Sequence, residues 1–209
     1  MPGWQLCATI HPLVSHYGVA MSMSKRRIPF TYEDYKSLPE SMEKRYELMD
    51  GDLFMVPAPT TRHQRVSQNI EYILVGYARR TQRGQVLDSP VDVVLGKGAE
   101  REIVQPDILF VATERAAIIT RAEVAGCPDL VIEVLSPGTE ERDNHYKKTL
   151  YARYGAEEYW IVDPEGNTLQ RYVRGADGFA APIFITAVET FSSPLLPGLV
   201  LECREIFAP

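Results

Sequence analysis

Two carboxylates, Asp107 and Glu133, stand inside stretches of the sequence that are otherwise apolar and strand-like. A buried carboxylate without a partner costs several kcal/mol, so such a group must be neutralised, paired or bound to a cation. Lys147 follows in a segment that has the pattern of a helix. Two acidic strands followed by a lysine-bearing helix are the layout of a metal-dependent phosphodiesterase site.

The metal that suits such a site is Mg²⁺, with Mn²⁺ as the other candidate. Mg²⁺ prefers oxygen ligands and keeps several waters, so two or three carboxylates and a backbone carbonyl can hold it. The candidate ligands are Asp107, Glu133, the backbone carbonyl of Val134, and Glu47 from an earlier predicted strand. A bound metal would polarise a phosphoryl group and lower the pKa of the attacking water. Lys147 near that water would orient it and offset developing negative charge.

Each of these residues also has a structural interpretation. Asp107 and Glu133 could be ordinary partners of Arg or Lys, or strand-end groups in water. Glu47 could be a surface residue, and Lys147 a solvated helix residue. Their occurrence together favours the site. His63 is a weaker candidate for a phosphate contact, because it begins a long predicted helix and helix N-termini attract anions. It could equally be a plain surface residue.

The bulk composition indicates one globular domain. The chain has 209 residues, of which 45% are hydrophobic and 24% charged, which is ordinary for a soluble protein. The net charge of −6 provides no overall basic field for nucleic acid.

The three cysteines, Cys7, Cys127 and Cys203, have no metal-binding spacing, which suits a reducing cytoplasm. No apolar run approaches the roughly 20 residues that span a bilayer. Residues 1–28 are expected to be an N-terminal extension of a domain at 29–209.

The pattern of apolar residues predicts alternating strands and helices. Thr31 followed by Asp34 resembles a capping box that opens a short helix to about residue 38. Asp50-Gly51 is a strong hairpin signal between two short strands in residues 44–56. Apolar residues recur with helical spacing over residues 61–81. Further strands are expected at residues 85–88, 92–95, 107–112, 130–135, 158–162, 169–173, 179–186 and 195–201. A polar turn at 137–143, with Asp143 capping or preceding the helix, leads into a helix at 144–154.

Six segments stand in order along the chain and together resemble one known family. They are residues 45–51 (RYELMDG), 63–64 (HQ), 105–107 (QPD), 128–137 (PDLVIEVLSP), 147–151 (KKTLY) and 158–163 (EYWIVD). From about residue 29 to residue 205, the chain resembles the Uma family of predicted endonucleases. This family lies within the PD-(D/E)xK restriction-endonuclease-like superfamily. The resemblance implies an α/β restriction-endonuclease-like fold, with a central mixed β-sheet flanked by helices, and a Mg²⁺-dependent nuclease site.

The family motif also implies roles for single residues. Asp107 and Glu133 match the metal-binding acids, Glu47 the upstream acid, and Lys147 the lysine carried on the helix. The chain departs from the superfamily pattern at Leu135, where the usual ExK motif has a lysine two residues after the acid. The function of that lysine would have to move to Lys147.

Lys147 is preferred over its neighbour Lys148 because it lies four residues before Tyr151, as in the family motif. Residues four apart on a helix share a face, whereas Lys148 is turned about 100° away.

The leading hypothesis is a Mg²⁺-dependent endonuclease that hydrolyses DNA phosphodiester bonds. The alternative is a catalytically inactive nucleic-acid-binding or protein-interaction module of the same fold. The net charge and the missing ExK lysine favour this alternative somewhat. The resemblance also suggests a homodimer, because restriction-like nucleases that cut both strands commonly pair two sites. DNA is therefore the expected partner, the cytoplasm the expected compartment, and no membrane is expected.

Overall fold

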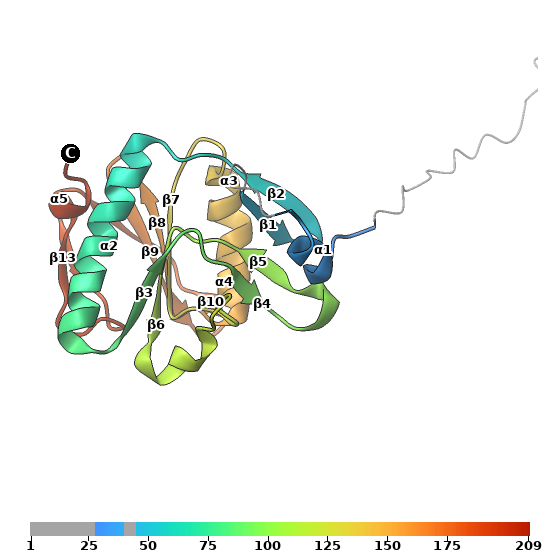
Figure 1. Ribbon diagram of the computed structural model, residues 1–209. Coiled ribbons are helices and arrows are strands. Elements are labelled where there is room, and N and C mark those ends of the chain that lie inside the picture. Colours follow the sequence, from blue (N-terminus) through green and yellow to red (C-terminus); the bar gives the residue numbers. More distant parts are fainter. Residues whose placement is uncertain (1–27, 40–44) are drawn as a thin grey trace, which may run out of the picture.

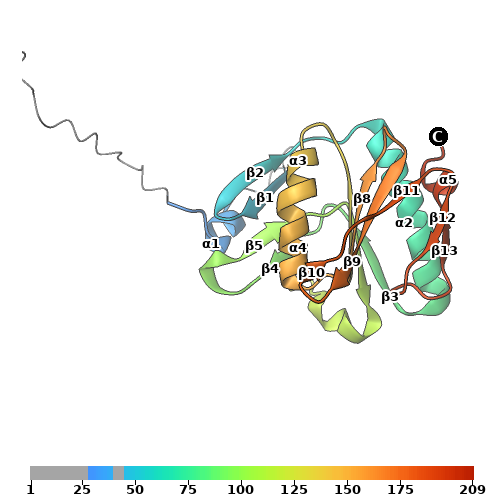
Figure 2. The same ribbon diagram turned by 180° about the vertical axis from the view of Figure 1, so that it is seen from behind.

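The computed structural model describes residues 28–39 and 45–209. The predicted N-terminal extension lies almost entirely outside these residues and stays a prediction. The described chain folds into one larger and one smaller β-sheet and a separate two-stranded pair, with helices packed on both faces of the larger sheet (Figure 1). Seen from behind, helix α4 (Lys148–Tyr154) lies in front of the larger sheet and helix α2 (Thr61–Thr81) lies behind it (Figure 2).

The larger sheet is the mixed sheet that the resemblance implies. Its strand order is β10-β9-β8-β7-β6-β3, with β11 also paired to β9. Strands β7 and β8 are parallel, and the other pairs of this sheet are antiparallel. The strands are β3 (Gly84–Asp88), β6 (Ile108–Ala112), β7 (Leu130–Val134), β8 (Glu158–Asp163), β9 (Thr168–Gly175), β10 (Gly178–Phe179) and β11 (Ile183–Thr186).

The smaller sheet begins with the hairpin that the sequence predicts. Asp50 and Gly51 have φ values of 49° and 72°, and a two-residue turn with positive φ at both positions matches the twist of a hairpin. The sheet order is β2-β1-β5-β4. Its strands are β1 (Arg45–Met49), β2 (Asp52–Val56), β4 (Val93–Leu95) and β5 (Glu102–Val104). Strand β5 was not among the predicted strands.

Helix α2 (Thr61–Thr81) has the predicted bounds. The side chain of Thr60 caps it by accepting a hydrogen bond from the backbone N–H of His63 at 3.1 Å. The buried residues Val66, Ile70 and Leu74 recur at helical spacing and pack on one face of the larger sheet. Complete burial of a side chain of this size contributes roughly 1.5–3 kcal/mol. This packing fixes where the first turn of α2 lies relative to β3 and β6.

A second helical stretch covers the opposite face of the larger sheet. It consists of α3 (Glu140–Arg142), a π-helical segment at Asp143–Lys147, and α4 (Lys148–Tyr154). Gly155, at φ 98°, ends it. The predicted polar turn at 137–143 is therefore wrong over its last four residues, which are helical. No residue of α3 is buried, so this part of the helix has no apolar periodicity to reveal it.

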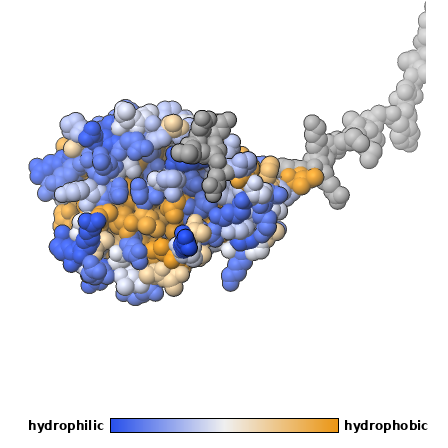
Figure 3. Space-filling model, viewed as in Figure 1, coloured by the Kyte–Doolittle hydropathy of each residue, from blue (hydrophilic) through white to orange (hydrophobic). Residues whose placement is uncertain are grey.

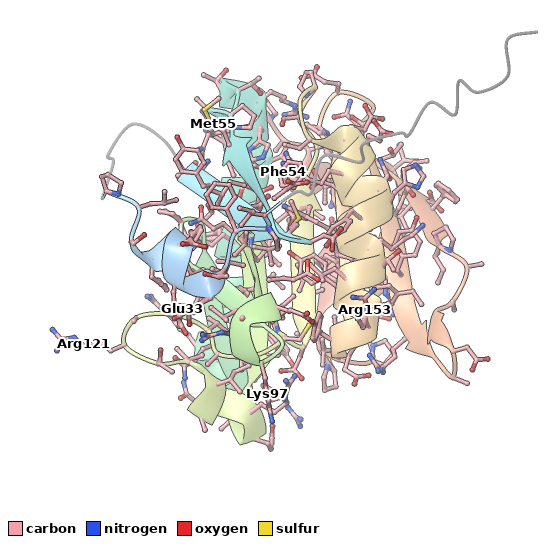
Figure 4. The ribbon with its side chains drawn as sticks, turned by 90° about the vertical axis from the view of Figure 1, so that its right-hand side faces the viewer. Glu33, Phe54, Met55, Lys97, Arg121 and Arg153 are labelled. Carbon is pink, nitrogen blue, oxygen red and sulfur yellow. The ribbon has the colours of Figure 1, made fainter. Side chains whose placement is uncertain are left out.

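The smaller sheet packs against the same core as α4. One buried cluster joins residues of the smaller sheet and of α4 to the larger sheet: Met49, Val104, Leu150, Tyr151, Leu109, Val111 and Val131. Figure 4 shows the hairpin strand β2, with Phe54 and Met55, beside α4, which carries Arg153. The guanidinium of Arg142 lies 5.1 Å from the centre of the Phe54 ring, which joins the hairpin to the helix.

The remaining elements are short. Helix α1 (Tyr32–Lys36) begins with the predicted capping box of Thr31 and Asp34, and two 3₁₀ helices lie at Gly98–Glu100 and Thr113–Ile118. The predicted strand at 179–186 is divided into β10 and β11, because Pro182 between them has no N–H for a ladder bond. The predicted strand at 195–201 is mostly a turn. Only its end joins β13 (Val200–Glu202), which pairs with β12 (Thr190–Ser192) before helix α5 (Cys203–Ile206).

Within the described residues, none of the helices combines the length and the apolar character that crossing a membrane requires. The face seen in Figure 3 is largely hydrophilic, including the surface over the upper half of α2, with an apolar area beside the lower half of that helix.

Candidate active site

Asp107 and Glu133 come together because β6 and β7 pair in the antiparallel sense. Ile108 lies opposite Ile132, so continuing the register by one residue places Asp107 opposite Glu133. Directly opposed residues share a face of the sheet. Asp107 Oδ2 accepts a hydrogen bond from the backbone N–H of Val134 at 2.8 Å, which holds this carboxylate at the end of β7. Glu133 lies within β7 and is 3% exposed.

Glu47 reaches the same place from the smaller sheet. It is buried on β1, and its Oε1 accepts a hydrogen bond from the backbone N–H of Gln105 at 2.9 Å. The Nζ atom of Lys147 lies 2.9 Å from Glu47 Oε1 and 2.9 Å from Glu133 Oε1. One ammonium therefore joins carboxylates from the two sheets.

The two neighbouring lysines lie in different environments. Lys147 and Tyr151 share a face of the helix, and the hydroxyl of Tyr151 donates to Glu133 Oε1 at 3.0 Å. The ammonium of Lys148 instead lies 5.2 Å from the centre of the Tyr172 ring. As expected, the ammonium of Lys147 lies in the acidic cluster and that of Lys148 lies outside it. The chemical role of Lys147 stays a prediction.

Asp143 is a member of the cluster that sequence reasoning missed. It was expected to cap or precede the helix, but it is buried within the π-helical segment, and its Oδ1 lies 3.4 Å from Lys147 Nζ. The signal available in the sequence was its position four residues before the lysine, because residues at that spacing share a helix face. Arg45 was also missed, although it belongs to the RYELMDG segment, and it lines the same cavity.

The cavity that these side chains enclose is small and strongly acidic. Its volume is about 30 Å³, enough for one water molecule or ion. Four carboxylates line it, together with the cations of Lys147 and Arg45 and the imidazole of His63, so acidic groups outnumber basic ones by one. The carboxylates are Glu47, Asp107, Glu133 and Asp143.

Burial and mutual repulsion shape the ionisation of this cluster. Burial raises the pKa of Glu133 well above its ordinary value, the charge of Lys147 opposes this rise, and Asp143, Asp107 and Glu47 add to it. Burial also raises the pKa of Asp143, again against the charge of Lys147. Burial lowers the pKa of Lys147, but the surrounding carboxylates outweigh burial and hold it well above its ordinary value. The carboxylates therefore favour the charged form of Lys147, while burial favours the protonated forms of Glu133 and Asp143.

A larger cleft of about 470 Å³ opens beside this cavity. His63 lies between them: its Nε2 is 3.2 Å from Asp107 Oδ2, and its buried Nδ1 has no hydrogen-bond partner within the described chain. Four residues line both spaces: Arg45, Pro59, His63 and Asp107. The two spaces therefore adjoin at the first turn of α2.

The carboxylate oxygens of this cluster suit a hard cation that takes few of its ligands from the protein. The hydrogen bonds to Asp107 go to Oδ2 and those to Glu133 go to Oε1. Within the described residues, the second oxygen of each carboxylate accepts none. No group of three or more His, Cys, Asp or Glu side chains in that part of the chain has metal-binding geometry. The ammonium of Lys147 lies between Glu47 and Glu133, and Mg²⁺ needs few protein carboxylates because it keeps waters.

Comparison with known proteins places the chain in a family. Residues 32–204 match the model of the Uma2 family, described as "Putative restriction endonuclease". The chain belongs to this family. The resemblance found in the sequence is therefore confirmed, and the Uma2 match covers both strands and the helix that form the cluster. No curated protein matches the sequence.

A solved structure has a similar fold. It is the crystal structure of a putative nuclease belonging to DUF820 from Anabaena variabilis ATCC 29413, with 18% sequence identity and a TM-score of 0.72. The match covers 86% of this chain and 98% of that chain. At this identity the likeness shows the fold alone, and it confirms the expected α/β architecture.

Proposed function

We propose that this Uma2 family member is a divalent-metal-dependent endonuclease that hydrolyses DNA phosphodiester bonds. Family membership supports the reaction class. The observation that carries the proposal is the cluster of four carboxylates, three of them buried, which outnumber the basic groups beside them. Buried acids in excess of their cations are unfavourable unless they take up protons or a further cation is held there.

The proposed ligands of Mg²⁺, or of Mn²⁺, are Asp107, Glu133, the carbonyl of Val134, and Glu47. The bound ion supplies a Lewis acid for the phosphoryl group and a water of lowered pKa. Asp107 is oriented by the backbone N–H of Val134 and by its contact with His63. Such outer contacts fix the orientation of ligating carboxylates.

The proposed role of Lys147 is to assist the attacking water or to offset the charge of the phosphoryl group. Its raised pKa makes it a stable donor rather than a proton acceptor. The carboxylates of Glu47 and Glu133 and the side chain of Asp143 hold the ammonium in place. An ammonium that is already held in position needs no reorganisation to stabilise the negative charge that develops in the transition state.

A plasmid-nicking assay tests this function. The wild-type chain should relax supercoiled DNA when Mg²⁺ or Mn²⁺ is added and not when EDTA is present. Asp107→Asn keeps the shape of the side chain and should lose roughly 100-fold or more of the rate, while Asp177→Asn, on an exposed turn, serves as the matched control. Nicking that survives Asp107→Asn unchanged, or a folded wild type that nicks with neither metal, would overturn the proposal.

One observation favours a second candidate function, a catalytically inactive module of the same fold. The ammonium of Lys147 already pairs with Glu47 and Glu133, where a metal would compete with it. Calorimetric titration with Mn²⁺ separates the two functions. The nuclease should bind Mn²⁺ in a manner that Asp107→Asn weakens, whereas an inactive module of this type should show no such binding.

We also propose that the protein acts as a homodimer, as a nuclease that cuts both strands would. The C-terminal strands expose apolar side chains that suit such a contact, with Ile183 52%, Phe184 66% and Val200 63% exposed. Light scattering should give a dimer mass, and a monomer mass at micromolar concentration would exclude this assembly.

A further inference from the structure

Strand β3 forms one edge of the larger sheet, and within the described residues no strand pairs with its outer side. The ladder to β6 shows which of its backbone groups are unused. The backbone N–H of Ser89, just beyond β3, donates to the carbonyl of Asp107 at 3.0 Å. In an antiparallel pair the direction of the hydrogen bonds alternates along the strand. The N–H and C=O groups that point away from β6 therefore belong to the even-numbered residues of β3: Gly84, Val86 and Asp88.

This row of donors and acceptors is complementary to itself. When Val86 of one copy lies opposite Val86 of a second copy, Gly84 lies opposite Asp88, and each outward N–H faces an outward C=O. The other edge of the larger sheet is divided into the shorter strands β10 and β11, with Pro182 between them. Proline has no N–H to donate to a ladder. The edge of β3 is therefore the one that suits pairing with an identical strand.

The surface beside this edge is apolar. Figure 3 shows an apolar area beside the lower half of α2, where β3 lies in Figure 1. Val75 of α2 and Val86 of β3 are only half-buried, and Tyr72 is 82% exposed. An exposed apolar surface with charged groups around it is typical of a contact with another protein.

The charged side chains at the two ends of this edge have opposite signs. Where β3 ends, Asp88 lies near Glu71 of α2, because its charge adds to burial in raising the pKa of Glu71. Where β3 begins, Arg79 in the last turn of α2 and Arg83 are exposed. No hydrogen bond or ion pair within the described residues involves these four side chains. A two-fold axis at Val86 sets the acidic end of each copy against the basic end of the other.

Other charged side chains near the edge leave this pattern in place. Arg65 lies six residues before Glu71, about 9 Å further along α2 and beyond the end of β3. Arg80 is turned about 100° around the helix from Arg79. Glu114 follows the end of β6, one strand inside the edge.

We propose that the edge of β3 is a contact between two copies of this chain, which pair their β3 strands antiparallel about a two-fold axis at Val86 and so join their larger sheets. This inference rests on the proposed homodimer and not on the proposed reaction. Glu71 and Asp88 also line the cleft beside the carboxylate cluster, so the contact brings basic groups of the second copy to the outer end of that cleft. The C-terminal strands are the competing surface, and the experiment decides between the two.

Paired charge reversals test this contact by light scattering of the full chain. Arg79→Glu with Arg83→Glu makes both ends of the edge acidic, and Glu71→Lys with Asp88→Lys makes both ends basic. Each double variant alone should raise the dimer dissociation constant roughly tenfold or more, because like charges then meet. An equal mixture of the two should restore the wild-type dimer, because opposite charges meet again.

Two single variants complete the test. Val86→Pro removes an outward N–H and no bond to β6, so it should weaken the dimer while circular dichroism shows a folded monomer. Phe184→Lys changes the C-terminal strands, where Phe184 is 66% exposed, and should keep the wild-type dissociation constant.

The outcomes separate this contact from the proposed function. A dissociation constant unchanged by the reversals and by Val86→Pro, a mixture of folded variants that stays monomeric, or a dimer that only Phe184→Lys weakens would overturn the contact. A monomeric wild type would overturn the contact and the proposed homodimer together, and Asp107-dependent nicking by that monomer would leave the nuclease standing. A charge-restored dimer without Asp107-dependent nicking would support the contact and overturn the nuclease.

Discussion

Replacing Lys147 with methionine removes the ammonium that three carboxylates share. The side chain is 4% exposed, and Nζ lies 2.9 Å from Glu47, 2.9 Å from Glu133 and 3.4 Å from Asp143. Methionine keeps most of the side-chain volume, so the change is mainly one of charge. Removing one partner of a buried ion pair typically costs about 3–5 kcal/mol, because the other charge is left uncompensated. We expect the free energy of unfolding at neutral pH to fall by this amount.

The loss of unfolding free energy in Lys147→Met should depend on pH. The charge of Lys147 opposes the rise in the pKa of Glu133 that burial causes, so the substitution raises this pKa further. Above the ordinary value of 4.5, the unfolded chain has lost the Glu133 proton, the folded wild type holds it up to its own raised pKa, and the folded variant holds it to a still higher pH. Since the folded state then binds more protons, its stability falls as the pH rises through this window. The deficit of Lys147→Met relative to wild type should therefore be smallest in acid and grow towards neutral pH.

Urea unfolding at about pH 5 and about pH 7.5 measures this difference. With a urea dependence of about 2 kcal/mol/M, the midpoint at the higher pH should fall by roughly 2 M. Lys148→Met is the matched control, because Lys148 lies over the Tyr172 ring and outside the cluster, and it should stay within about 0.5 kcal/mol of wild type. In the nicking assay, Lys147→Met should lose roughly 10²–10³ in rate. A deficit that is equal at both pH values, or an equal effect of Lys148→Met, would refute this reasoning.

Three further substitutions test other parts of the structure. Arg171→Met breaks the buried two-point contact with Glu158, at 2.9 and 3.1 Å, and should cost about 3–5 kcal/mol in urea unfolding without changing the nicking rate of the folded protein. Tyr151→Phe removes the hydroxyl that donates to Glu133. It should cost about 1.5–3 kcal/mol, because the acceptor is a carboxylate, and an unchanged unfolding midpoint would contradict this bond. Thr60→Ala removes the cap of α2 and should cost about 1 kcal/mol by thermal unfolding, with Thr60→Ser largely restoring it.

The sequence predicts the elements whose stabilising interactions are local. The bounds of α2 follow from an apolar stripe that runs along the whole helix, and the structure adds Thr60 as its cap. The β1–β2 hairpin follows from Asp50-Gly51, where both residues adopt positive φ. Strands β6 and β7 follow from continuous apolar runs, and their antiparallel pairing brings the two predicted acids together.

The elements that the sequence does not predict depend on distant partners. Strand β5 has three residues, too few to show alternation, and its buried Glu102 accepts a hydrogen bond from the distant Tyr146 hydroxyl. Asp143 is hidden because the helix around it starts with exposed polar residues. The cleft is equally invisible, since its walls combine β1, α2 and β3, which the sequence does not place side by side.

The bridge that Lys147 makes between Glu47 and Glu133 connects parts of the fold that share no strand pairing. Glu47 belongs to the smaller sheet and Glu133 to the larger one, and the lysine is carried by the helix packed against both. The same charged groups that form the candidate site therefore also hold the two sheets together. Any cation that competes with the ammonium for these carboxylates must also alter how firmly the hairpin is held to the rest of the molecule. Occupancy of the cavity and docking of the hairpin are thus thermodynamically linked.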